Sequence, residues 1–325
     1  MSGGIGVARQ AAMTALLAVA VAGGAALAAP GGATAEAVVS GTAHESLFAI
    51  SARGGHALAV GDMGVVLGSD DGCRSWQPQA TPVDGIAMLD VYLGDRTAVA
   101  VGQGGTILVR DPSGGWERAS SPTQARLLGV GGNAAGLIFA VGAFGAVVRS
   151  EDQGHSWSAV PIDWGQFVND GFEPHLYDVA VAADGSVTIA GEFELILRSA
   201  DRGATWTAAH RGRASLFSLS MDDAGRGYAV GQSGRVLHTD DGGRRWSAVA
   251  FDGDSILLNV WQQRDRVAVV GIRDFRWSDD RGATWSALHN EDIATNWYSG
   301  IAGCGGDDGW VIAGHSGRLV RISGE

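Results

Sequence analysis

Short apolar runs alternate with glycine, serine and aspartate along most of the chain. One such run, AVGQGGTILVR at residues 100–110, returns in seven related copies whose aligned glycines lie 40 to 49 residues apart. A second apolar run precedes each copy, as LYDVAV precedes the fourth, and a shorter one such as WSAV follows several of them. Apolar runs of this length between turn-forming residues predict β-strands. Each period therefore predicts four strands.

Seven periods of four strands predict an all-β fold, a seven-bladed β-propeller of four-stranded antiparallel blades. The seventh period stops after its third strand, LVRIS, and an open blade would leave a row of unpaired backbone groups. The segment EAVVSGT at residues 36–42 precedes the first period, at the place where a fourth strand is needed. We therefore predict one domain over residues 36–325, in which this N-terminal strand completes blade seven and closes the ring.

The N-terminal segment is typical of a secretory signal peptide. An apolar, alanine-rich stretch follows Arg9, and small residues at 26–28 and 33–35 are candidate cleavage sites. We predict a signal peptide over residues 1–28, with cleavage as late as residue 35 as a variant, and a periplasmic or secreted protein. About 20 apolar residues can span a bilayer, so an uncleaved membrane anchor is the alternative.

A polar motif, SADRGATW at residues 199–206, recurs after the third predicted strand of five periods. Its aspartate and hydroxyl can accept backbone N–H bonds within a turn, and its glycine can take a positive φ. The tryptophan then begins the outer strand and buries its indole. A unit that recurs in this way is structural, so we interpret these boxes as staples of the fold. Their residues are Asp71, Trp76, Asp152, Trp157, Asp201, Trp206, Asp241, Trp246, Asp280 and Trp285. Blade two has only a worn copy, DPSGGW, ending at Trp116.

The box resembles the Asp-box or BNR repeat, and the coupled AVG-x-x-G-x-(I/V)-L-R-S run is similar to the photosystem II assembly and stability factor family of seven-bladed propellers. The resemblance covers residues 46–323, with local departures at Cys73 and in the IRDFRW turn of blade six. It implies a scaffold for membrane-protein assembly intermediates without catalytic machinery. Relatives in bacteria that do not photosynthesise imply a link to export systems of the resistance-nodulation-division (RND) type. The expected partner is therefore a membrane protein or an exported polypeptide, with an RND-type transporter as one possibility.

One period departs from the others by an insertion, PIDWGQFVNDGFEPH at residues 161–175. The turn GEFE of the same blade and the charged turn of blade six are expected on the same face as this insertion. Aromatic side chains with a charged rim suit protein recognition, and we expect Trp164 to be a surface anchor whose loss costs little stability. The alternative is a loop that only packs over the channel mouth. The expected partner-binding residues are Trp164, Phe167, Asp170, Phe172, Glu173, His175, Glu192, Phe193, Glu194, Arg273 and Asp274. Three of these acids, Glu173, Glu192 and Glu194, are expected to steer a basic segment.

Charge argues against nucleic acid as a partner. The chain has 35 acidic and 23 basic residues, every basic one an arginine, and a formal net charge of −12. An acidic chain without a basic run is a poor ligand for nucleic acid or an anionic membrane. Its eight histidines are scattered and no cysteine pair joins them, so we expect no metal and no cofactor. A monomer is expected.

A glycoside hydrolase of the sialidase type, or a carbohydrate-binding propeller, is the rival interpretation, because sialidases also carry Asp boxes. Such an enzyme needs an arginine cluster, a tyrosine activated by a glutamate and an aspartic acid. The chain has only four tyrosines, Tyr92, Tyr177, Tyr228 and Tyr298, and lacks the Phe/Tyr-Arg-Ile-Pro signature. We therefore expect no enzyme.

The two cysteines, Cys73 and Cys304, fall in blades one and seven, which are neighbours in a closed ring. Both are expected on the face opposite the insertion. A disulfide needs Cα atoms within about 7 Å, and Cys73 belongs to an outer turn but Cys304 to an inner one. Two free thiols are therefore favoured, with a disulfide at the seam as the alternative.

Overall fold

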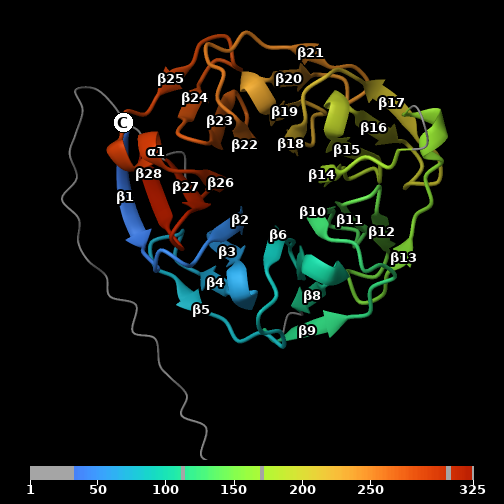
Figure 1. Ribbon diagram of the computed structural model, residues 1–325, viewed down its shortest axis with the longest axis horizontal. Helices are drawn as coiled ribbons and strands as arrows, with labels where there is room; N and C mark the ends of the chain where they lie inside the picture. Colours follow the sequence, from blue (N-terminus) through green and yellow to red (C-terminus); the bar gives the residue numbers. More distant parts are fainter. Residues whose placement is uncertain (1–32, 111–113, 169–171, 305–308, 324–325) are drawn as a thin grey trace, which may run out of the picture.

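The computed structural model describes residues 33–110, 114–168, 172–304 and 309–323. They form seven four-stranded antiparallel sheets arranged as blades around a central channel (Figure 1). The predicted seven-bladed, all-β propeller is confirmed. The signal peptide predicted over residues 1–28 lies outside the described residues, as does Asp170.

In blades one to six the strands follow chain order from the channel outward, and in blade seven the outermost strand is β1. Blade one contains β2 Leu47–Arg53, β3 His56–Gly61, β4 Val66–Ser69 and β5 Gln77–Pro78. Blade two contains β6 Met88–Leu93, β7 Ala98–Gly102, β8 Ile107–Arg110 and β9 Trp116–Ala119. Blade three contains β10 Leu127–Gly132, β11 Ile138–Gly142, β12 Val147–Ser150 and β13 Ser158–Ala159. Blade four contains β14 Leu176–Val181, β15 Val187–Gly191, β16 Ile196–Ser199 and β17 Thr207–His210. Blade five contains β18 Leu216–Met221, β19 Gly227–Gly231, β20 Val236–Thr239 and β21 Ser247–Ala248. Blade six contains β22 Leu257–Gln263, β23 Arg266–Gly271, β24 Phe275–Ser278 and β25 Ser286–Ala287. Blade seven contains β26 Tyr298–Gly303, β27 Gly309–Gly314, β28 Leu319–Ser323 and β1 Thr34–Val39.

Short helical segments occupy some of the connections. The α-helix α1 spans Glu291–Thr295, and the 3-10 turns are η1 Asp62–Gly64, η2 Gln103–Gly105, η3 Trp164–Gln166, η4 Glu192–Glu194 and η5 Gln232–Gly234. None of the helices among the described residues is long and apolar enough to cross a membrane.

The ring is closed by its first strand. β1 pairs antiparallel with β28, from Thr34 opposite Ser323 to Val39 opposite Leu319. Figure 1 shows β1 beside β28 at the outer edge of blade seven. The predicted closing strand is confirmed, although it begins two residues earlier than residue 36 and ends at Val39. Backbone pairing thus satisfies the edge that the third strand of blade seven would otherwise expose.

The core lies between neighbouring blades. The second strand of every blade is almost wholly buried, as in β15, where all five residues are buried, because both of its faces pack against other blades. This explains why these strands are continuous apolar runs rather than alternating ones. One core cluster joins Phe139 and Val141 of blade three to Val187 and Leu197 of blade four.

Cys73 and Cys304 form a disulfide, with Cα atoms 5.7 Å apart. The preference for two free thiols was wrong, because Cys73 does not point outward from its turn. It takes a left-handed backbone conformation (φ 64°) and is 1% exposed, in the core between blades one and seven. The covalent bond therefore joins the same two blades that β1 closes by hydrogen bonding.

The Asp boxes form tight turns between the third and fourth strands. In blade four, Ser199 Oγ donates to Asp201 Oδ1 (2.7 Å), which also accepts from the Thr205 N–H (2.8 Å). Thr205 Oγ1 donates to the second carboxylate oxygen (2.5 Å), and Ser199 Oγ accepts from the Gly203 N–H (2.8 Å). The bonds from Thr205 and Ser199 lower the pKa of Asp201 to about 2. All these contacts are local, as a structural staple requires.

The other boxes repeat this pattern with small variations. Thr284 and Ser278 lower the pKa of Asp280 to about 2 in the same way. In Asp71, Asp152 and Asp241 the carboxylate also accepts from the hydroxyl two residues before it and from backbone N–H groups after it. Trp76 and Trp246 are buried, whereas Trp157, Trp206 and Trp285 are half-buried.

Candidate functional site

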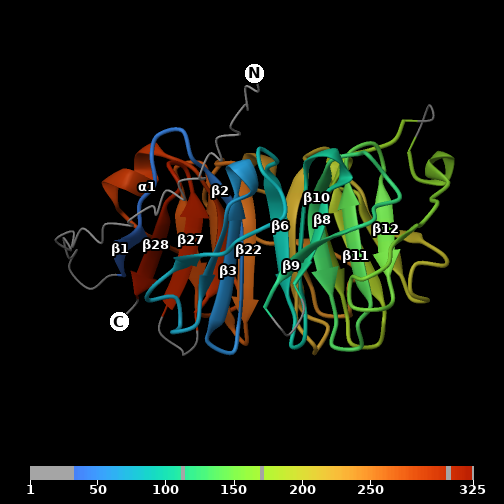
Figure 2. The ribbon, with the colours of Figure 1, turned by 90° about the horizontal axis from the view of Figure 1, so that it is seen from below.

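One face of the ring carries the turns between second and third strands and the segments that lead into each inner strand. In each blade, a backbone N–H in the turn between the second and third strands donates to the carbonyl of the residue just before the inner strand. In blade four the Glu192 N–H donates in this way to the His175 carbonyl (3.0 Å). The equivalent bond occurs in all seven blades. We call this face the turn face. Figure 2 shows it along one edge of the ring, with α1 and the insertion of blade four on the same side.

Exposed apolar side chains gather on the turn face. Of the described chain, the six large apolar residues that are most exposed all belong to its turns or to the segments that lead into its blades. They are Met63 (63% exposed), Phe144 (68%), Phe172 (46%), Phe193 (48%), Ile256 (37%) and Ile272 (39%). Exposed large apolar groups that cluster on one side of a protein mark an interaction surface.

Three of these residues stand at the apex of their turns in a conformation that disfavours them. Met63, Phe144 and Phe193 have φ values of 57°, 54° and 60°. The left-handed region costs a residue with a Cβ roughly 1–2 kcal/mol and suits glycine or asparagine. The equivalent apex in blade two is Gly104, and in blade five it is Ser233. Ser233 has the same left-handed conformation (φ 55°), so these three turns differ from the others in the size and exposure of an apolar side chain and not in the backbone.

The insertion does not present its first two aromatic residues to solvent. Trp164 is 8% exposed and Phe167 9%, and both belong to the core between blades three and four. The indole of Trp164 lies so close to Gly145 that a Cβ there would come within 2.3 Å of Nε1. The expectation that Trp164 and Phe167 are surface anchors was wrong, because η3 turns their rings inward against the neighbouring blade.

The rest of the insertion reaches the surface. The exposed ring of Phe172 meets that of Phe193 edge to face at 5.8 Å between centroids. Glu173 is exposed, and His175 is half-buried with its ring 5.1 Å from that of Phe144. His175 Nδ1 also accepts from the Phe144 N–H (3.2 Å). The insertion therefore connects two of the three strained apexes.

Two of the predicted acids are internal rather than exposed. Glu194 is 3% exposed, and its carboxylate contacts His210 (3.0 Å) and Arg235 (3.0 Å). Burial alone would raise the pKa of Glu194, but hydrogen bonds from His210 and nearby backbone N–H groups lower it below the ordinary value. Asp274 is 8% exposed and pairs with Arg276 (3.1 Å). Their predicted role as exposed charges was wrong, because each carboxylate is bound by neighbouring cations.

The other charged residues that were predicted to bind a partner lie on the turn face. Glu192 is half-buried and accepts from the His175 N–H (2.8 Å), so it ties the insertion to η4. Arg273 is exposed, with φ 61°, and its N–H donates to the Asn296 carbonyl (2.8 Å). With Glu194 and Glu192 engaged internally, Glu173 is the one predicted steering acid that stands free in solvent among the described residues.

A cleft opens beside the two exposed phenylalanines. It has a volume of about 320 Å³, with Phe172 and Phe193 at its mouth and Phe167 and Leu195 among its lining. Gly212 also lines the cleft, next to Phe193, because its N–H donates to the Phe193 carbonyl (2.7 Å). The volume is at the lower end for ligand pockets, which run from about 300 to 1,000 Å³. Such a cleft can hold one large apolar side chain of a partner.

The exposed apolar apexes share one position in the sequence repeat. Met63, Phe144 and Phe193 all occupy the second variable position of the AVG-x-x-G motif. That position is the apex of the turn, so a large apolar residue there must be exposed. Within the described ranges, no group of three His, Cys, Asp or Glu side chains is arranged to hold a metal ion.

Comparisons with known proteins point to one family. The sequence profile of the family described as Photosynthesis system II assembly factor YCF48 matches residues 159–255, less than half of the chain. The structure of YCF48 from Cyanidioschyzon merolae has a TM-score of 0.71 at 20% identity, covering 89% of this chain and 98% of that one. A structure of YCF48 bound to D1 peptide has a TM-score of 0.69 at 16% identity, covering 95% and 100%. The predicted resemblance to this family is confirmed.

The fold itself is shared more widely than the YCF48 sequence features. Catalytically inactive virginiamycin B lyase from Staphylococcus aureus with quinupristin has a TM-score of 0.75 at 9% identity, covering 90% of this chain and 99% of that one. The sequence matches no curated protein. Identities this low establish the propeller fold alone. The YCF48 profile match, in contrast, spans the insertion, η4 and the cleft between Phe172 and Phe193.

Proposed function

We propose that this photosystem II assembly factor-like propeller is a non-catalytic, secreted scaffold that binds a segment of a membrane protein or of an exported polypeptide through its turn face. An RND-type export component fits this class of partner. The observation that carries the proposal is the gathering of the most exposed apolar residues on one face, three of them at strained apexes. Aromatic anchors beside a cleft supply most of the binding energy in protein interfaces.

The similarity to YCF48 supports a polypeptide as the ligand. One solved YCF48 structure has a D1 peptide bound, and its fold covers 95% of this chain. By analogy, a peptide segment of a membrane protein would lie across the turn face here, with an apolar side chain in the cleft beside Phe193. The mixed charges nearby would then set orientation and association rate rather than affinity.

The rival enzymatic function finds no suitable nucleophile. A sialidase-type mechanism requires a tyrosine that ionises readily, but burial raises the pKa of Tyr92, Tyr177, Tyr228 and Tyr298. Tyr298 is fully buried and donates to Asp292, and Tyr228, whose pKa is about 12, donates to the Arg281 carbonyl (3.0 Å). These hydroxyls are structural donors, which supports a scaffold without catalytic activity.

Secretion is supported by the disulfide, since such bonds persist in oxidising compartments. Ala33 is 6% exposed in the core of blade seven, and Thr34 and Ala35 pair with Ser323 and Ile322. Cleavage after residue 35 would remove these contacts, whereas cleavage after residue 28 would keep them. We therefore propose the earlier site, which the N-terminal sequence of the exported protein would test. A mature chain that begins at residue 36, or one that keeps the segment as an anchor, would contradict it.

The binding proposal is tested with a double variant, Phe144→Ser and Phe193→Ser, which installs the residue found at the blade-five apex. The immobilised protein would be exposed to solubilised membranes, and synthetic segments of each captured protein would then be titrated. We expect binding to fall at least tenfold in the double variant. Asp223→Ser, an exposed change on the opposite face, is the control and should bind as the unaltered protein does. Equal binding by all three proteins would exclude the turn face as the site.

A further inference from the structure

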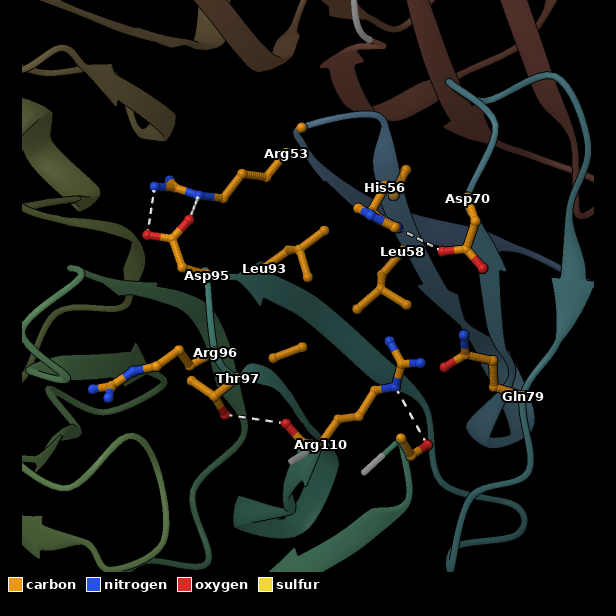
Figure 3. Close-up of a pocket in the computed structure, with 15 residues that line it drawn as sticks. Arg53, His56, Leu58, Asp70, Gln79, Leu93, Asp95, Arg96, Thr97 and Arg110 are labelled. Carbon is orange, nitrogen blue, oxygen red and sulfur yellow. Dashed lines mark hydrogen bonds and ion pairs between the residues drawn. The ribbon is translucent and has the colours of Figure 1, made fainter. Parts of the chain in front are cut away.

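A separate cavity lies between blades one and two, on the face opposite the turn face. That face carries the box turns and the hairpins between first and second strands, which bond to one another, as the Gly72 N–H does to the Gly55 carbonyl (2.9 Å). We call it the box face. The cavity has a volume of about 460 Å³ and is open to solvent (Figure 3). Its polar lining distinguishes it from the apolar cleft at Phe193.

The lining of this cavity includes the position at which blade two departs from the repeat. In the five blades with an intact box, the third strand ends in a small hydroxyl residue that bonds to the box aspartate. These residues are Ser69, Ser150, Ser199, Thr239 and Ser278, all 4% exposed or less. Blade two has Arg110 there, opposite Ala98, just as Ser150 lies opposite Ile138 in blade three. An arginine thus replaces the buried hydroxyl in the blade whose box is worn.

Blade one contributes the other part of the cavity lining. Gly68 occupies a position that holds Arg149 in blade three and Arg198 in blade four. Arg149 and Arg198 each cross to the box turn of the following blade, where they donate to backbone carbonyls at 2.9 and 2.7 Å. Gly68 has no side chain to do so, and the amide of Gln79 lies beside it instead. A cavity of the same volume lies between blades four and five beside Arg198, so the cavity of blades one and two differs in its lining and not in its size.

Arg110 has no acidic partner among the described residues. Its side chain is half-buried, and in this part of the chain it makes one long hydrogen bond, from Nε to the Gly114 carbonyl (3.4 Å). Arg96, an exposed arginine of the same lining, also has no acidic partner within the described ranges, whereas the other charges on the wall are paired. Arg53 binds Asp95 through two hydrogen bonds (2.5 and 2.9 Å), and His56 contacts Asp70 at 2.7 Å.

Figure 3 shows how these groups are arranged. The guanidinium of Arg110 points into the space between Leu58 and Gln79, whereas Arg96 points away from the other side chains drawn. An arginine fork directed into a partly enclosed space is suited to a carboxylate or a phosphate, which it can bind through two parallel hydrogen bonds. The Gln79 amide nitrogen and the Asp70 carboxylate add hydrogen-bonding groups to the lining, while Gln79 Oε1 accepts from Trp116 Nε1 (2.8 Å) and Asp70 Oδ1 contacts His56.

We propose that the Arg110 cavity binds a small hydroxylated organic anion, such as a sugar acid or a sugar phosphate. The anionic group lies on the guanidinium of Arg110, and hydroxyl groups of the ligand bond to Gln79 and Asp70. A cavity of about 460 Å³ is larger than a simple ion needs and lies within the range for small-molecule sites. This site lies on the box face, so it is independent of partner binding on the turn face.

The decisive variant is Arg110→Ser, which restores the residue found in the intact boxes. Binding of gluconate, glucose 6-phosphate and inorganic phosphate to the exported protein would be measured by titration calorimetry. Arg244→Ser is the matched control, because Arg244 lines the equivalent cavity between blades four and five, where the box is intact. We expect the unaltered protein to bind the two organic anions more tightly than inorganic phosphate. Arg110→Ser should bind these anions at least tenfold more weakly than the unaltered protein, and Arg244→Ser should bind them equally well.

Three results would overturn the proposal. The first is no binding of any probe to the unaltered protein at concentrations up to about 10 mM. The second is an equal loss in both variants, which would mean a general charge effect. The third is inorganic phosphate binding as tightly as the organic anions, which would mean a site for the charge alone. Thermal unfolding of Arg110→Ser distinguishes lost binding from lost folding, and we expect its midpoint to match or exceed that of the unaltered protein.

Discussion

Replacing Trp164 with alanine separates a packing role from a surface role. A tryptophan buries about 150–250 Å² on folding, and at about 25 cal/mol per Å² that area corresponds to roughly 4–6 kcal/mol as an upper estimate. Trp164 is 8% exposed and contacts Phe167 edge to face at 6.4 Å, so nearly all of that area is lost on truncation. Large aromatic-to-alanine changes in cores cost about 3–5 kcal/mol, and we expect this range for Trp164→Ala.

The assay is urea unfolding followed by far-ultraviolet circular dichroism, because a fluorescence signal would be confused by the 11 tryptophans. Phe172→Ala is the control from the same insertion. Its ring is 46% exposed, and we expect its loss to cost less than about 1 kcal/mol. Equal losses in the two variants, or a loss below about 1 kcal/mol for Trp164→Ala, would refute the inward packing of η3.

Three other properties follow from the structure. Removing the disulfide by changing Cys73 and Cys304 to serine should lower the free energy of unfolding by about 2–5 kcal/mol, as urea unfolding with and without a reductant would measure. The pKa of Asp201 is depressed to about 2, so its contribution to stability is present above about pH 4 and is lost as the pH falls towards 2. Acid unfolding of Asp201→Asn should therefore be less steep in that window. Burial raises the pKa of Asp178 to about 6, so ionisation of this inner-strand carboxyl opposes folding as the pH rises through 6. The fall in stability between pH 4 and pH 8 should accordingly be smaller in Asp178→Asn than in the unaltered protein, whatever constant cost arises because the amide can accept only one of the backbone N–H bonds from Val179 and Leu219. Urea unfolding at the two pH values measures this difference.

The periodic part of the structure could be predicted from sequence because each blade repeats the same solution. Spacing of the glycines was enough to place the strands, and the missing strand of blade seven identified β1. Side-chain direction within the insertion could not be predicted in this way. A single copy of a loop has no repeat to align it with, so Trp164 and Phe172 look alike in sequence although one is buried and the other exposed.

The cysteines show a related limit. The closed ring predicted that the two cysteines lie in neighbouring blades. The distance between their Cα atoms, however, depends on the conformation of one turn. Cys73 reaches Cys304 because its backbone is left-handed, at a box position where other copies have glycine. The glycines of the other boxes indicate a positive φ at that position, but sequence spacing does not give the distance between the two Cα atoms, so the choice between a bridge and two thiols needed the three-dimensional structure.

Equivalent positions in the seven blades can be compared to identify residues that the fold itself does not require. Gly104 and Ser233 show what the apex accepts when folding alone selects the residue, and Ser150 shows the same for the end of the third strand. Ser233, Arg273 and Ser316 also take positive φ values at this apex (55°, 61° and 52°), so the backbone conformation is shared by the turns and the side chain is what differs. Phe144 is 68% exposed, so burial within the chain returns little of the cost of placing its apolar ring in water. An exposed aromatic ring at an apex where blade five has serine is therefore the physical basis for proposing that the turn face binds a partner.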